Sequence, residues 1–207
     1  MASKTEIANM AVRFCGIGYA IGDIETEESS EARSIRAFFD TALREFLEEQ
    51  WWTWATKFAT LALVTNNPSV HWAYAYQVPE DCVCAREIQN PAIKITHNID
   101  RVPFRIVDGV THSQAGRVLY CDIANPVLEY TYLLTDVSKL PGAATIALGH
   151  LLAHYIANDQ TLGVRPDISE RERQLYVAKL KVASRTDKGE AFESPKLESE
   201  YTSARRG

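Results

Sequence analysis

The stretch that decides the fold is EEQWWTWATKFATLALV, residues 48–64. It joins a charged helical pattern to an apolar segment with strong β propensity, and it contains Trp51, Trp52 and Trp54. We expect Trp52 and Trp54 to be buried where a helix meets a block of strands, because an indole buries a large area and its N–H can reach a partner at such a seam. Trp51 lies on a different face and is the candidate for an exposed or inter-subunit indole.

Upstream of this junction, the hydrophobic pattern predicts two helices. Residues 4–17 form an amphipathic pattern that is followed by glycines. The second helix is expected over residues 27–50, with Thr26 as its N-cap. Its apolar stripe consists of Ala32, Ile35, Phe38, Phe39, Ala42, Leu43 and Phe46. This stripe dominates the energetics of the helix, since a buried large side chain contributes about 1.5–3 kcal/mol and an exposed ion pair only about 0.2–0.5 kcal/mol.

Downstream, alternating apolar residues predict strands within residues 57–135, and a helical period then returns. Helices are expected over 141–162, apolar almost all round and therefore central, and over 167–187, with a narrow apolar seam. The seam residues are Leu175, Ala178 and Val182. Segregated runs of this kind predict an α+β fold: a helical bundle of two N-terminal and two C-terminal helices with a central antiparallel β block.

Residues 1–188 are expected to form one domain, and residues 189–207 an extended C-terminal tail. The tail has no regular hydrophobic period, but it contains spaced large apolar and aromatic residues that could anchor it to a partner, and two arginines near its end. These residues are Phe192, Leu197, Tyr201, Arg205 and Arg206. A tail of this composition can become ordered along another subunit, and a frayed terminus explains the composition equally well.

The bulk composition excludes some classes of protein. A formal charge of −5 over 207 residues argues against a basic DNA-binding surface, although DNA could pass an acidic wall without sticking to it. No apolar run is long enough for a membrane helix, and the N-terminus lacks a signal-peptide core. Cys82 and Cys84 are expected on one face of a strand as small apolar groups, so we place the protein in a reducing cytoplasm, or in an assembly made there.

The sequence offers little catalytic chemistry. His150 and His154 are four residues apart and could share a metal, but Leu151 stands where the zinc-protease pattern requires a glutamate. A polar pocket or an interface is therefore the favoured role for both histidines. Neither a nucleophile elbow nor a phosphate-binding loop of the Walker type is present. We expect no catalytic residues, no cofactor and no metal.

Three segments together resemble one protein family. WTWATKFATLALV, from Trp52, resembles the tryptophan-rich segment after the second helix of phage head-to-tail adaptor proteins, the group that includes tail tubular protein A. WAYAYQVPEDCVCAREI is similar to the family's aromatic strand and Pro-x-Asp turn, and LEYTYLLTDVSKLPGAATIALGHLLAHYIA to its strand, loop and long Ala/Leu helix. The resemblance runs from about Ile7 to Lys188. Trp54 replaces the more usual phenylalanine, and the tail does not align.

The resemblance implies a structural virion protein without catalytic residues or cofactor. It would be assembled in the host cytoplasm and form a homo-oligomeric ring, expected to be a dodecamer, in the neck between the portal protein and a tail or nozzle protein. DNA would pass through the lumen without sequence-specific binding, with no membrane involved. The tail anchors are hypothesised to dock on the portal.

Complementary subunit faces are a further hypothesis. Arg171 and Arg173 of the last helix would meet an acidic second helix, with Glu45, Glu48 and Trp51 also at the interface. Another neck protein, a stopper or tail terminator, is the first alternative function. A small metal-dependent hydrolase using His150 and His154 is the second.

Overall fold

The structure, a computed structural model, describes residues 2–65, 67, 69–92, 102–108, 116–159 and 162–189. Two short 3-10 helices, η1 (Thr53–Ala55) and η3 (Val137–Lys139), connect the larger elements. The helices are α1 (Lys4–Phe14), α2 (Ser30–Glu49), α3 (Gly142–Ala157) and α4 (Pro166–Gly189). The strands are β1 (Thr56–Thr60), β2 (Ala62–Leu63), β3 (Tyr74–Gln77), β4 (Cys82–Gln89), β5 (Arg105–Asp108), β6 (Arg117–Cys121) and β7 (Val127–Tyr132).

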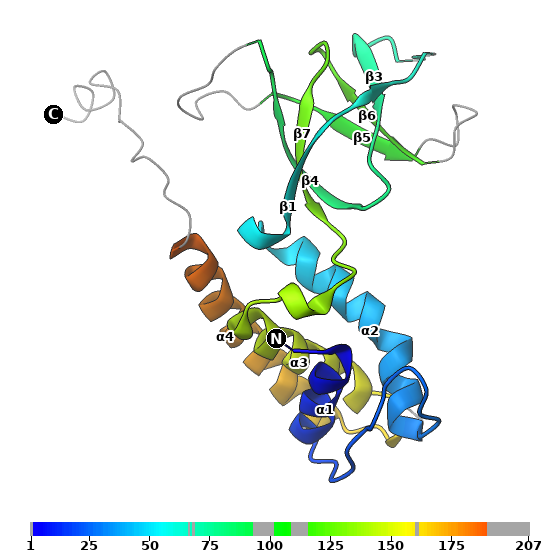
Figure 1. The fold of residues 1–207 in the computed structure, drawn as a ribbon, viewed down its shortest axis with the longest axis vertical. Helices are drawn as coiled ribbons and strands as arrows, with labels where there is room; N and C mark the ends of the chain where they lie inside the picture. The colour runs from blue at the N-terminus through cyan, green and yellow to red at the C-terminus, as the bar shows by residue number, and fades with distance from the viewer. Residues whose placement is uncertain are drawn as a thin grey trace, which may run out of the picture.

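The helices lie at one end of the molecule and the strands at the other (Figure 1). The strands form two antiparallel sheets, with the orders β1-β7-β4 and β2-β3-β6-β5. Their inner faces enclose a second core that includes Tyr76, Leu119, Leu128 and Tyr130. The predicted α+β class is confirmed: two N-terminal and two C-terminal helices form a bundle, and the antiparallel β block lies between them in the sequence.

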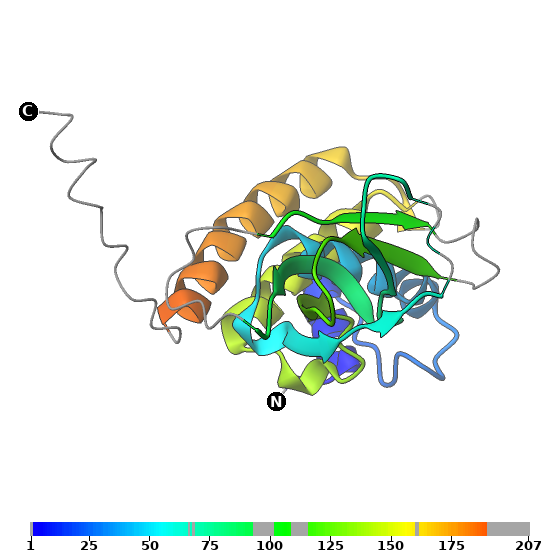
Figure 2. The ribbon, with the colours of Figure 1, turned by 90° about the horizontal axis from the view of Figure 1, so that it is seen from above.

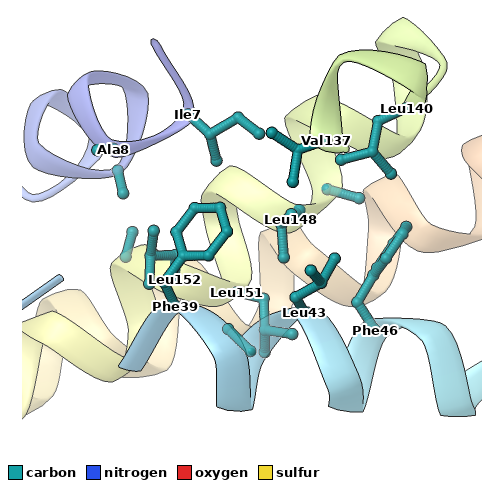
Figure 3. Packing of buried hydrophobic residues seen from close by; sticks show 14 of the residues in the cluster. Ile7, Ala8, Phe39, Leu43, Phe46, Val137, Leu140, Leu148, Leu151 and Leu152 are labelled. Carbon is teal, nitrogen blue, oxygen red and sulfur yellow. The ribbon is translucent and has the colours of Figure 1, made fainter. Parts of the chain in front are cut away.

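Helix α3 is the centre of the helical core, as its apolar sequence predicted. It packs against α1, α2 and α4, and its residues meet those of α1, α2 and η3 in Figure 3. The labelled side chains are Ile7, Ala8, Phe39, Leu43, Phe46, Val137, Leu140, Leu148, Leu151 and Leu152. Gly149 allows α1 to approach closely, because a Cβ added there would lie 3.3 Å from the ring of Phe14.

Helix boundaries differ from the predicted ones for local reasons. Helix α1 ends at Phe14 and not at 17, because Gly16 adopts the left-handed conformation with φ of 72°. Helix α2 begins at Ser30 because Ser29 is the N-cap and accepts a hydrogen bond from the Ala32 amide at 3.2 Å. Thr26, the predicted cap, instead donates its hydroxyl proton to Asp23 at 2.9 Å. Helix α3 ends at Ala157 instead of 162, and α4 covers 166–189 instead of 167–187.

One prediction about the strands is wrong, and the apolar stretch after the tryptophans is divided between the two sheets. Residues 58–64 do not form one strand, since β1 pairs with β7 and β2 pairs with β3 in the other sheet. Leu61 is buried between them in the core of the β block. A bulge in β4 pairs Cys82 with Tyr132 but Cys84 with Thr131, so the two cysteines do not share a face.

The tryptophan junction fastens the helices to the sheets; Trp52 is buried there as predicted, whereas Trp54 is only partly buried. The Trp52 side chain is fully buried, stacks on Phe46 at 4.8 Å between ring centroids, and lies 5.3 Å from the Trp54 ring. Arg86 of β4 reaches the end of α2, where it donates hydrogen bonds to the carbonyl oxygens of Leu47 and Gln50. These carbonyl groups have no partner within the helix, so Arg86 acts as a C-terminal cap supplied by the sheet.

Candidate interaction surfaces

The residues predicted for a subunit interface are partly engaged within the chain. Arg173 of α4 donates a hydrogen bond to Glu45 of α2 at 2.6 Å, and Tyr155 of α3 donates its hydroxyl proton to the same carboxylate. Burial raises the pKa of Glu45, but the hydrogen bonds from Tyr155 and Arg173 outweigh it and hold that pKa below its ordinary value. This network joins three helices. Contact of Arg173 or Glu45 with a second copy stays a prediction.

The other predicted interface residues differ in accessibility. Arg171 binds the carbonyl oxygen of Phe14 at 2.7 Å, yet 57% of its side chain is exposed. Glu48 is exposed, whereas Trp51 is half-buried and forms a hydrogen bond with Glu129. Burial and the neighbouring Glu87 carboxylate raise the pKa of Glu129. The tail anchors Phe192, Leu197, Tyr201, Arg205 and Arg206 lie outside the described residues.

The two histidines lie in polar positions between α3 and α4, in agreement with the favoured interpretation. His150 is buried, stacks on Phe14 at 4.1 Å, and its Nδ1 atom lies 2.6 Å from Oε2 of Glu172. His154 Nδ1 lies 2.8 Å from the Ser169 hydroxyl. Within the described part of the chain, no cluster of three or more His, Cys, Asp or Glu residues could hold a metal ion.

The cysteines do not form a reactive centre in the described residues. All four thiols are free. Burial raises the pKa of Cys15 to about 11, so its thiol is protonated at neutral pH and is a poor nucleophile. Cys15 instead donates a hydrogen bond to the Ala153 carbonyl oxygen at 3.3 Å, which ties the end of α1 to α3.

Helix α4 buries Tyr176, Leu180 and Ala183 in the core together with two carboxylates, and it leaves the predicted apolar seam exposed. Its buried face includes Glu172 and Asp187, and the Asp187 carboxylate accepts hydrogen bonds from the amide and hydroxyl groups of Thr53. The predicted seam lies on the opposite side of the helix: Leu175 is 37% and Val182 51% exposed. We call this side the outer α4 face. It consists of Arg171, Leu175, Ala178, Val182 and Arg185.

The outer α4 face has a basic border. Between residues 171 and 188, both carboxylates of the helix are buried, whereas five basic residues are exposed. These are Arg171, Lys179, Lys181, Arg185 and Lys188. Of the five, only Arg171 makes an ion pair with a residue in the described ranges. Sequence reasoning found the seam and Arg171 but could not assign Glu172 and Asp187 to the interior, because their partners are distant in the sequence.

A second charged surface lies between α1 and α2. Residues 19–31, YAIGDIETEESSE, contain five carboxylates and no basic residue, and we call them the acidic segment. Glu25 and Glu28 form ion pairs with Lys4 at 3.4 Å and Arg36 at 3.7 Å, but their side chains remain 63% and 78% exposed. Tyr19 is 49% exposed at the beginning of this segment. Figure 2 shows the acidic segment and α1 on one side of the helical layer and α4 on the other.

An open groove of about 690 Å³ lies between α1 and the beginning of α3. The residues that line this groove are mainly apolar, and its only ionisable side chains are those of Glu6 and Arg13. Glu6 accepts a hydrogen bond from the Ser3 amide at 2.7 Å as part of the α1 capping box. The groove therefore lacks a set of convergent, unengaged polar groups of the kind that binds a substrate.

The fold and these surfaces define a class: an α+β protein with two charged outer surfaces, the outer α4 face and the acidic segment. Neither a family model nor a curated protein matches the chain. In the described residues, no helix is both long enough and apolar enough to cross a bilayer.

Proposed function

We propose that this chain is a phage head-to-tail adaptor, a structural virion protein that forms a ring between the portal and the tail. The observation that carries this proposal is the orientation of α4, which buries Glu172 and Asp187 and exposes Leu175 and Val182 within a basic border. A helix with an apolar, positively bordered outer face suits a protein that works by binding other protein surfaces.

The resembling segments give further support, because they form the parts of the fold that join its two halves. The first contains the Trp52 junction, η1 and β1, and the second contains β3 and β4 with the Arg86 cap. The third contains β7, η3 and α3, the central helix of the bundle. A rigid body of this kind can continue a channel, bridge portal and tail, and retain packaged DNA without any catalytic step.

Electron microscopy tests the proposal. The purified chain is imaged alone and after mixing with the portal protein and with the tail or nozzle protein of the same virus. We expect rings, dodecameric by the resemblance, attached to the portal on one side and to the tail component on the other. A chain that binds neither protein and forms no ring contradicts the proposal. Rings that bind only the end of a tail tube, or only a preassembled adaptor, indicate a terminator or a stopper instead.

The alternative of a metal-dependent hydrolase has little geometric support. His150 and His154 already direct their Nδ1 atoms to Glu172 and Ser169, and their neighbours do not supply a third ligand among the described residues. Elemental analysis of the purified protein separates the two functions, since stoichiometric zinc would favour the hydrolase.

Portal docking by the C-terminal tail stays part of the proposal. The hypothesis assigns the contact to Phe192, Leu197, Tyr201, Arg205 and Arg206. A chain that ends at Gly189 retains every described helix and strand, so we expect it to fold but to lose its attachment to portal particles. Unchanged attachment in a pull-down with portal would remove the tail from the docking mechanism.

A further inference from the structure

The outer α4 face and the acidic segment have opposite charges and similar layouts. The outer α4 face has an apolar centre, formed by Leu175, Ala178 and Val182, between basic side chains. The acidic segment presents one large exposed side chain, Tyr19, beside the carboxylates of residues 23–31. An aromatic anchor with a charged rim is the usual anatomy of a protein interface, and opposite rim charges favour the correct pairing and faster encounter.

Within one chain, the outer α4 face reaches toward the acidic segment only at Arg171, which binds the Phe14 carbonyl oxygen at the end of α1. The acidic segment lies with α1 on one side of the helical layer and α4 lies on the other (Figure 2). Helix α4 packs against α3, and Leu175 and Val182 of the outer α4 face are exposed. Within the described ranges, the ion pairs of the acidic segment are made with Lys4 and Arg36, and none reaches α4. The part of the outer α4 face from Leu175 to Arg185 is therefore open to a second molecule.

We propose that Tyr19 and the acidic segment of one copy dock on the outer α4 face of a neighbouring copy. The Tyr19 ring packs on Leu175, Ala178 and Val182, while the carboxylates of the segment meet Lys181 and Arg185. Two different surfaces of the same chain are then used at each contact, which is a heterologous interface that can close into a ring. The ring itself rests on the proposed function, whereas the docking of copies does not require it.

Charge reversal and rescue test the electrostatic part. We expect Arg185→Glu and Glu28→Arg to weaken copy-to-copy association each by about tenfold or more, and the double variant to recover most of the loss. Both side chains are exposed, so neither change should unfold the chain. Arg33→Glu, an exposed site on α2 outside both surfaces, alters the net charge as Arg185→Glu does and should leave association unchanged. Sedimentation at several salt concentrations measures the effect, which should weaken as salt screens the rim.

Failure of the rescue, or an equal loss in the Arg33→Glu control, would show that net charge and not a specific contact governs association. A second control addresses the apolar centre. Leu175→Ser should weaken association, whereas Val164→Ser, at a 54% exposed valine outside both surfaces, should have no effect.

Photo-crosslinking identifies the occupant of the outer α4 face. Tyr19 is replaced by p-benzoylphenylalanine in the full chain, and ¹⁴N and ¹⁵N copies are mixed at millimolar concentration, free and with portal. We expect crosslinks to residues 171–188 of a copy with the other isotope. Crosslinks within one copy, crosslinks to residues 190–207, or none under either condition would overturn the docking model.

The same preparation separates the two proposals. Crosslinked copies that form no portal-bound ring would retain the docking and contradict the adaptor function. Portal-bound rings whose crosslinks lie elsewhere would retain the adaptor function and contradict the docking.

Discussion

The indole nitrogen of Trp52 donates a hydrogen bond to the carbonyl oxygen of Phe46 at 3.0 Å, and the two rings stack. The acceptor lies in the last turn of α2, where carbonyl groups lack helical partners. The Trp52 side chain therefore caps the C-terminus of α2 and fills part of the helical core. The same residue precedes η1, which leads into the β block.

Removal of the Trp52 side chain should be among the most costly changes in the chain. Trp52→Ala is expected to lower the free energy of unfolding by about 3–5 kcal/mol, because it leaves a cavity and an unpaired carbonyl group. Trp51→Ala is the matched control and should cost much less, since this indole is only half-buried. Urea unfolding followed by circular dichroism measures both, and equal costs would contradict the anchoring role of Trp52.

Asp187 should stabilise the same junction from the far end of the chain. Its carboxylate accepts hydrogen bonds from Thr53, so Asp187→Ala leaves a backbone amide without its partner and is expected to cost about 1–3 kcal/mol. Asp40→Ala, at an exposed position of α2, should change the stability by less than about 0.5 kcal/mol. If the two variants unfold at the same denaturant concentration, Asp187 has no capping role.

The buried pair of His150 and Glu172 should be sensitive to the loss of one member. Glu172→Ala removes the carboxylate beside the His150 ring and the partner of Arg171, and we expect a loss of about 3–5 kcal/mol. Glu170→Ala, two residues away and exposed, is the control and should be nearly neutral. Thermal unfolding of both proteins provides the comparison, and a stable Glu172→Ala protein would argue against a structural pair.

The Glu45 network should make stability depend on pH in acid. Because the folded pKa of Glu45 is lowered from 4.5, the folded state favours its ionised form. Its contribution is thus fully present above about pH 4.5 and is lost as the pH falls through the lower folded value. The difference in free energy of unfolding between wild type and Glu45→Gln should be constant near neutrality and shrink below that pH. A difference that does not depend on pH would contradict this assignment.

Glu129 should show the opposite sign. Burial and Glu87 raise its pKa above 4.5, so its ionised form destabilises the folded state at neutral pH. Glu129→Gln is expected to stabilise the chain at pH 7 by about 0.2–1 kcal/mol, the range for like charges on paired strands. The gain should disappear below about pH 4.5, where both states are protonated. Glu48→Gln, on the exposed side of α2, is the control and should not stabilise the chain.

The local pattern of apolar and polar residues in the sequence was sufficient to predict much of the fold. Helical periodicity identified all four helices, because a long amphipathic or apolar stripe has few alternatives to packing as a helix. The tryptophans marked the seam for the same reason, since indoles of this size are stable only where a large apolar area is available. Where the predictions missed, as at Ser29 and in the β4 bulge, the outcome depended on single hydrogen bonds and on strand register.

The sequence by itself determined the α+β class, the order of its elements and the central position of α3. Only the tertiary structure decided the orientation of α4 and therefore the surface that the chain offers to partners. The inward face of that helix combines the apolar Tyr176, Leu180 and Ala183 with the carboxylates of Glu172 and Asp187. The carboxylates lie there because His150 and Thr53, distant in the sequence, supply their hydrogen-bond donors. Whether a charged side chain is buried depends on such partners, and the local sequence pattern does not reveal partners that are distant in the chain.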